Sequence, residues 1–310
     1  MIYPYLIAVM TSLIFGLSFL FTKGALDYVT PQQLLAFRFL TAALLLMILR
    51  TLGLIKINFR QRPLGKIILL AFFEPVLYFI FETTGVKLTT SSEAGLMIAL
   101  IPVFVTILAI LILKEIPHPL QVGSILISVA GVGFIVLGGE RLTTSGHTYG
   151  LLALLGAVLS AAFFNILSRR LSREFCPVEI TYVMMCVGAL FFGGSALLDT
   201  VRRPDPLAVL ALLQIKEVWS AVLYLGVFSS VVAFFGLNYY ISKLGAARSA
   251  VFTNLTTIVS VAAGICFRGE HFYWYHLVGG ILILLGVWGT NRMANPRPRS
   301  ESTSPRSSPR

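Results

Sequence analysis

Residues 96–113 read LMIALIPVFVTILAILIL, a stretch without a single charged residue. A bilayer core of about 30 Å is crossed by about 20 helical residues, so a stretch of this length and character predicts a membrane-spanning helix. A membrane β-strand would instead alternate polar and apolar residues over about ten positions. The stretch therefore indicates an all-α integral membrane protein.

Similar apolar stretches recur along the whole chain of 310 residues. Composition agrees, because 57% of the residues are hydrophobic and only 12% are charged, whereas soluble domains carry about 25% charged residues. The first stretch lacks a basic n-region and is too long for a signal peptide, so we expect it to be the first helix. The pattern predicts ten transmembrane helices, at about 4–25, 32–50, 65–85, 92–113, 119–138, 149–169, 178–198, 217–240, 247–267 and 272–291.

The net charge of +11 is expected to set topology and not to bind nucleic acid, because the basic residues fall between the apolar stretches. With a cytoplasmic N-terminus, most of the 24 lysines and arginines lie on the inner side. Arg38 falls inside a helix, and only seven lie on the outer side: Lys23, Lys87, Arg141, Arg202, Arg203, Lys216 and Arg268. The positive-inside rule thus predicts a multi-pass inner-membrane protein with both termini in the cytoplasm.

The two halves of the sequence can be laid over each other. Lys23 then pairs with Arg169, Pro31 with Pro177, Glu115 with Glu270, and Gly131 with Gly286. Five crossings per half is an odd number, so the second half enters the bilayer in the opposite orientation. Such inverted repeats are a recurring plan of secondary transporters. We expect repeats at 3–139 and 147–292, followed by a disordered cytoplasmic tail at 293–310. A solvated tail that marks the inner side is the favoured interpretation, and contact of its arginines with anionic membrane lipid is the alternative.

The order of the ten helices and two short motifs resemble the EamA-like family of drug/metabolite transporters. The motifs are the KE and GE turns at Glu115 and Glu270, with the helices VGSILISVAGV (122–132) and VGGILILLGV (278–287) that follow them. The resemblance implies a ten-helix fold with both termini inside, and alternating-access transport of metabolites such as amino acids. The two halves differ in their third helices. The second-half stretch VFSSVVAFFGLNYY (227–240) has serines at the positions that correspond to Glu74 and Pro75 in the first half.

Other classes of protein fit less well. An integral membrane enzyme acting on lipid needs converging nucleophiles, bases or metal ligands, and no HxxxD, HExxH or GxSxG motif occurs. The three cysteines have no metal-ligand spacing, so we expect neither a metal nor a cofactor. A primary pump would need a Walker-type motif. A non-transporting membrane scaffold stays as an alternative, and the oligomeric state is left open.

Glu74 is the strongest candidate for a functional residue. It lies near the middle of the third predicted helix, where an ionisable group is costly and normally faces the bundle interior or a wet cavity. A carboxyl whose protonation depends on its surroundings suits a proton carrier, or a counter-ion for an amine substrate. The alternative is a structural ion pair, with Arg38 as the partner. Pro75 is expected to kink the helix.

Tyr78 and Glu82 follow Glu74 at intervals of four and could share one polar strip of the helix. Glu82 lies closer to the outer surface, so simple hydration is the alternative. Arg38 could pair with Glu74, hold a substrate carboxylate, or snorkel to the outer interface. In the second half, amides and hydroxyls could coordinate a polar metabolite or only join helices; the candidates there are Asn165, Asn238, Tyr239 and Asn254.

Overall fold

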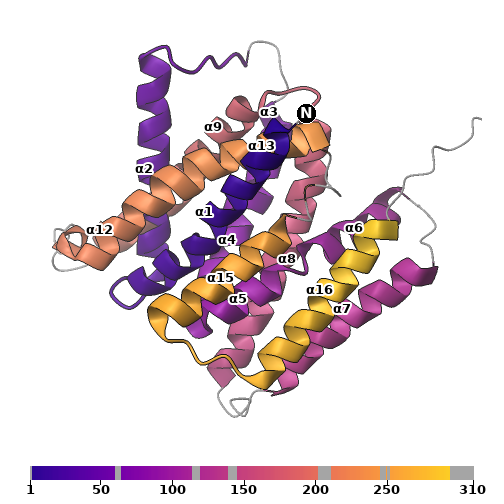
Figure 1. Ribbon diagram of the computed structural model, residues 1–310. Helices are drawn as coiled ribbons and strands as arrows, with labels where there is room; N and C mark the ends of the chain where they lie inside the picture. Colours follow the sequence, from indigo (N-terminus) through magenta and orange to yellow (C-terminus); the bar gives the residue numbers. More distant parts are fainter. Residues whose placement is uncertain are drawn as a thin grey trace, which may run out of the picture.

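The computed structural model describes residues 2–59, 64–113, 119–138, 145–201, 211–244, 249 and 252–293. Within them all regular structure is helical, and helices lie over each of the ten predicted ranges (Figure 1). The predicted tail at 293–310 lies outside the described residues from 294 onward. The α-helices are α1 (Tyr3–Ala25), α2 (Pro31–Thr51), α3 (Leu64–Ala71), α4 (Tyr78–Leu88), α5 (Ser91–Ile98), α6 (Ile101–Leu113), α7 (Pro119–Gly138), α8 (Ser145–Leu171), α9 (Pro177–Gly188), α10 (Gly194–Val201), α12 (Lys216–Leu223), α13 (Phe234–Leu244), α15 (Thr253–Arg268) and α16 (Trp274–Met293).

The helices have the length and surface of membrane-spanning segments. In the described part of the chain, seven helices are long and apolar enough to cross a bilayer. The shorter apolar helices Val122–Ile135 and Trp274–Gly289 lie within α7 and α16. Large apolar side chains face outward, for example Leu190 at 78% exposure and Phe267 at 74%. An apolar outer surface of this extent requires lipid around it, so the chain is a multi-pass membrane protein.

Three of the long helices are interrupted by a π-helical segment. The segments are η1 (Phe72–Leu77) between α3 and α4, η3 (Ala189–Gly193) between α9 and α10, and η5 (Tyr224–Ala233) between α12 and α13. Such widened turns are frequent at functional sites. In η1 the backbone of Glu74 is extended, with φ −145° and ψ 113°. Pro75 follows it and has no N–H to donate, so the predicted kink at Pro75 is confirmed.

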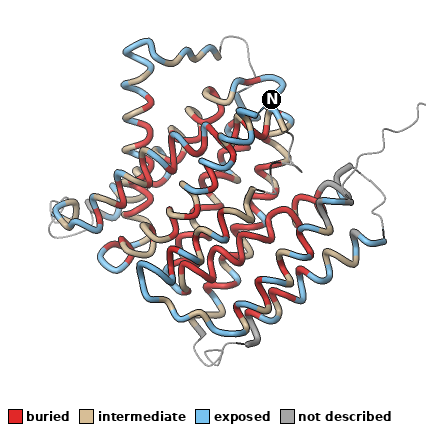
Figure 2. The backbone as a smooth tube through the Cα atoms, in the orientation of Figure 1, coloured by how far each residue is buried: buried red, intermediate tan, exposed pale blue. Residues whose placement is uncertain are grey.

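The buried residues form one core along the middle of the bundle (Figure 2). Phe39 of α2, Phe164 of α8 and Phe234 of α13 are its largest fully buried side chains. In Figure 1, α7 and α16 run side by side at one edge of the molecule. They approach closely because glycines face each other: a Cβ on Gly131 would lie 2.6 Å from the carbonyl oxygen of Gly279.

Candidate functional site

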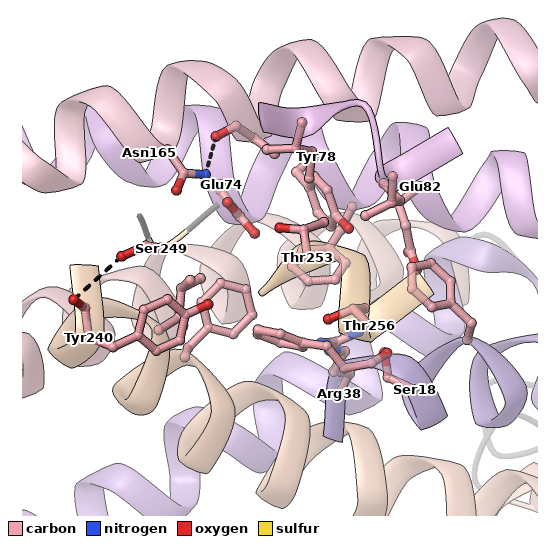
Figure 3. Close-up of a pocket in the computed structure, with 18 residues that line it drawn as sticks. Ser18, Arg38, Glu74, Tyr78, Glu82, Asn165, Tyr240, Ser249, Thr253 and Thr256 are labelled. Carbon is pink, nitrogen blue, oxygen red and sulfur yellow. Dashed lines mark hydrogen bonds between the residues drawn. The ribbon is translucent and has the colours of Figure 1, made fainter. Parts of the chain in front are cut away.

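A cavity of about 70 Å³ lies inside the bundle (Figure 3). That volume has room for a few water molecules or a small polar group. Helices from both halves of the chain line it: α1, α2, α4 and α5 from the first half, and α8, α13 and α15 from the second, together with η1, the first residue of α6, and Ser249. The cavity therefore lies where the two halves of the sequence meet.

Five of the eight candidate residues line this cavity, namely Arg38, Glu74, Tyr78, Glu82 and Asn165. Asn238, Tyr239 and Asn254 are not among its lining residues. Sequence reasoning had not singled out Ser18 or Ser249, which also line it. Tyr78 and Glu82 lie four residues apart on α4, whereas Glu74 lies before that helix, in an extended backbone conformation. All three line the cavity, but the helical spacing applies only to Tyr78 and Glu82.

Glu74 is brought to the cavity by the interruption of its helix. It is only 5% exposed, and its carboxyl group points into the cavity on the side where Asn165 lies (Figure 3). Among the described residues, neither an ion pair nor a hydrogen bond joins this carboxyl group to another side chain. Burial of a carboxylate without a partner is costly, so the charge of Glu74 depends on what occupies the cavity.

Glu82 is 2% exposed, so it is not a hydrated surface residue. Its Oε2 accepts a hydrogen bond of 2.9 Å from the Thr83 hydroxyl. Tyr78 packs edge-on against Phe79, with 4.8 Å between the ring centroids. Two carboxyl groups and one phenol thus reach the cavity from η1 and the adjoining helix α4.

Arg38 neither snorkels to an interface nor forms the predicted ion pair. It is 2% exposed, and neither Glu74 nor Glu82 lies within ion-pairing distance of its guanidinium. Instead Nε donates to Ser230 Oγ and Nη2 donates to Ser229 Oγ, both at 2.8 Å. The reason is local geometry: the wide turn of η5 presents two adjacent serine hydroxyls to α2.

The three candidate amides of the second half differ in what they contact, and Asn238 is the one that joins helices. Asn238 is 1% exposed; its Oδ1 accepts from Ser168, and its Nδ2 donates to Thr181 Oγ1 and to the carbonyl of Phe234. Asn165 lines the cavity but donates to the carbonyl of Ala161, four residues earlier in its own helix. The buried Oδ1 of Asn254 has no hydrogen-bond partner among the described residues.

A second polar cluster, which sequence reasoning missed, lies where α4 ends and α5 begins. Glu270 accepts hydrogen bonds at its Oε1 from the backbone N–H of Ser91, and at its Oε2 from the backbone N–H and the hydroxyl of Ser92, at 2.8, 2.9 and 2.6 Å. It thereby satisfies the unpaired N–H groups that begin every helix. Its charge also matches the positive end of the helix dipole.

The same cluster contains Glu93, Lys23 and two histidines. Glu93 Oε2 accepts from the backbone N–H of Thr90, while its Oε1 lies 3.0 Å from His147 Nε2 and 3.3 Å from His276 Nε2. Lys23 donates to the carbonyls of Val86, Lys87 and Thr89 at the end of α4. Both helix ends are thus capped by groups from distant parts of the sequence.

These features define a class, a multi-pass membrane protein with a polar cavity enclosed between its two halves. The chain belongs to the EamA-like transporter family, whose model matches residues 2–137 and again 148–292. This match confirms the resemblance noted in the sequence.

The relatives agree with the family. The chain is 36% identical over 288 residues to the uncharacterized transporter YcxC of Bacillus subtilis, covering 93% of this chain and 92% of that one. It is 26% identical over 246 residues to the probable terminal-alkyne amino-acid exporter of Streptantibioticus cattleyicolor, covering 79% and 78%. These relatives are named as transporters, which confirms the expectation of a transporter and not of an enzyme. A crystal structure of another protein shares the fold, with a TM-score of 0.62, 21% identity, and coverage of 97% and 99%.

The capping of α5 by Glu270 predicts a measurable effect on stability. Replacing Glu270 by alanine leaves two backbone N–H groups and the Ser92 hydroxyl without an acceptor. We expect a loss of about 1–3 kcal/mol in the free energy of unfolding, measured by denaturant titration in detergent micelles. The matched control is Glu174→Ala, which removes an exposed ion pair with Lys66 and should cost less than about 1 kcal/mol. Equal losses in the two variants would contradict the capping role.

Proposed function

We propose that this protein is a secondary active transporter of a small polar metabolite, an amino acid or a related compound. It works by alternating access, and it couples transport to protons or to exchange at Glu74. The observation that carries this proposal is the Glu74 carboxyl group, which is buried, faces the cavity and is joined to no other side chain among the described residues. The relative named as an amino-acid exporter supports the substrate class.

A carboxyl group in this position can be neutralised in two ways. It can bind a proton from water, or it can stay charged beside a cationic group of the substrate. One site cannot do both at once, so proton and substrate would compete for Glu74. Competition of this kind couples the movement of one to the movement of the other.

We further propose that the chain crosses the cell membrane ten times, as two inverted five-helix repeats with both termini in the cytoplasm. Corresponding helices of the two halves begin alike: α2 and α9 both start at a proline and both carry a capping box, with Gln33 and Glu179 as the capping residues. The π-helical segments η1 and η5 also fall in corresponding helices. The family model matches the chain twice, once in each half.

Labelling tests the inversion directly. Asp27 and Arg173 occupy corresponding positions in the two halves, in the turns after α1 and α8, and both are exposed. In a background without the three native cysteines, Asp27→Cys should react with an impermeant maleimide added to intact cells. Arg173→Cys should react only after the membrane is opened. Reaction of both residues from the same side would rule out inverted repeats.

The role of Glu74 is tested by transport. Glu74→Gln keeps the size of the side chain but cannot release a proton, so we expect proton-driven uptake into proteoliposomes to fall to background. The variant should still elute as a single species and unfold near the wild-type temperature. The control is Glu174→Gln, because Glu174 lies on the surface and away from the cavity. Transport that stays undiminished and pH-driven in Glu74→Gln would remove this role.

A further inference from the structure

Arg38 is held rigidly at the wall of the cavity. Two of its donors bind the hydroxyls of Ser229 and Ser230 at 2.8 Å. Its guanidinium carbon lies 4.1 Å from the centre of the Phe79 ring, a distance at which the cation is attracted to the ring face. The side chain is therefore fixed by protein contacts, and its position does not depend on a ligand.

The serine contacts leave part of the guanidinium free. An arginine has five N–H donors in a fixed fork, and the two contacts occupy one on Nε and one on Nη2. The remaining donors meet no acceptor among the described residues, although Arg38 lines the cavity. A guanidinium stays charged at any physiological pH, and neither Glu74 nor Glu82 approaches it closely enough to form an ion pair. A buried cation of this kind lacks a bound anion.

The positions of the charges indicate which ligand would fit. Figure 3 shows Arg38 on the side of the cavity where Ser18 and Thr256 lie, while Glu74 lies across the cavity toward Asn165 and Ser249. Glu82 also lines the cavity, but neither carboxyl group contacts the free donors of Arg38. A cation alone would leave those donors without an acceptor, and an anion alone would leave the Glu74 carboxyl group without a partner. A zwitterion carries both complementary charges, and Phe15, Phe19 and Phe234 offer an apolar wall to the rest of the molecule.

We propose that Arg38 binds the carboxylate of a zwitterionic substrate, whose ammonium group faces Glu74. This inference rests on the proposed function and deepens it, because it assigns Arg38 as the residue that selects for a free carboxylate. Ser229 and Ser230 are positioning residues that hold the guanidinium in place. They stand at the positions that correspond to Glu74 and Pro75 of the first half. Arg38 and Glu74 both belong to the first half, and the second half holds Arg38 in place.

The test compares probes that differ only at the carboxylate. The standard L-amino acids would first be screened for thermal stabilisation of the purified full-length protein. The best stabiliser would then be compared with its methyl ester and with the amine left by its decarboxylation. We expect the amino acid to bind at least about tenfold more tightly than either analogue. Binding that is equal or tighter for the amine, or the absence of any stabilising amino acid, would overturn the proposal.

Variants link this preference to Arg38. In Arg38→Gln the ratio of the affinity for the amino acid to the affinity for either analogue should fall toward one. Arg38→Lys keeps the charge but not the forked geometry, so it should retain part of this preference. The control is Arg50→Gln, at the exposed end of the same helix, where the preference should be unchanged. Ser229→Ala combined with Ser230→Ala should raise KM more than it lowers the maximal rate.

An Arg38→Gln variant that keeps the full preference would overturn the proposal. If Arg38→Gln does not fold, Arg38→Lys carries the test alone: a reduced preference supports the proposal, and an undiminished preference overturns it. Failure here is distinguishable from failure of the transport proposal: pH-driven transport of an amine that depends on Glu74, without a preference for a carboxylate, would contradict only the inference about Arg38.

Discussion

A polar group inside a membrane bundle must find a partner within the protein or face a cavity, because hydrocarbon offers it no hydrogen bond. Most polar side chains of this chain meet the requirement locally. Ser12 and Thr106 donate to carbonyls four residues earlier, and Asn238 uses both ends of its amide. Among the charged groups that the structure describes, the Glu74 carboxyl group and the free donors of Arg38 do not meet it in this way. Both face the same cavity, which is why we assign the function there.

The polar contacts that close the bundle join its two halves. Glu270 from the second half caps α5 of the first, while Arg38 of the first half is held by Ser229 and Ser230 of the second. The hydroxyl of Ser260 donates to the carbonyl of Ser91 across the same junction. A movement of one half against the other must therefore break these bonds or move both partners together. Alternating access in this chain requires one of these two outcomes at each bond.

The sequence predicted the helices well, because bilayer-length apolar stretches depend only on local composition. It also grouped Glu74, Tyr78 and Glu82, and all three line the cavity. The spacing by four explains this only for Tyr78 and Glu82, because the helix is interrupted at Glu74. It could not predict what Arg38 binds, because its serine partners lie 192 and 191 residues away. For Asn238 the sequence left open whether the amide binds a metabolite or joins helices. The structure shows that it joins α13 to Ser168 and Thr181 on neighbouring helices. From the sequence, Glu270 is only one of the residues that pair between the two halves. In the structure its neighbour Gly269, in the αL conformation, ends α15, and Glu270 itself caps α5.

The central claim is that Glu74 gains and loses a proton inside the membrane, and infrared spectroscopy tests it without knowledge of the substrate. The protein in liposomes would be titrated with buffer while the carbonyl stretch of protonated carboxyl groups is recorded. The account predicts a band that changes with bulk pH, persists in Glu174→Gln and is lost in Glu74→Gln. A titrating band that is identical in wild type and Glu74→Gln, or the absence of any titrating band, would contradict the account.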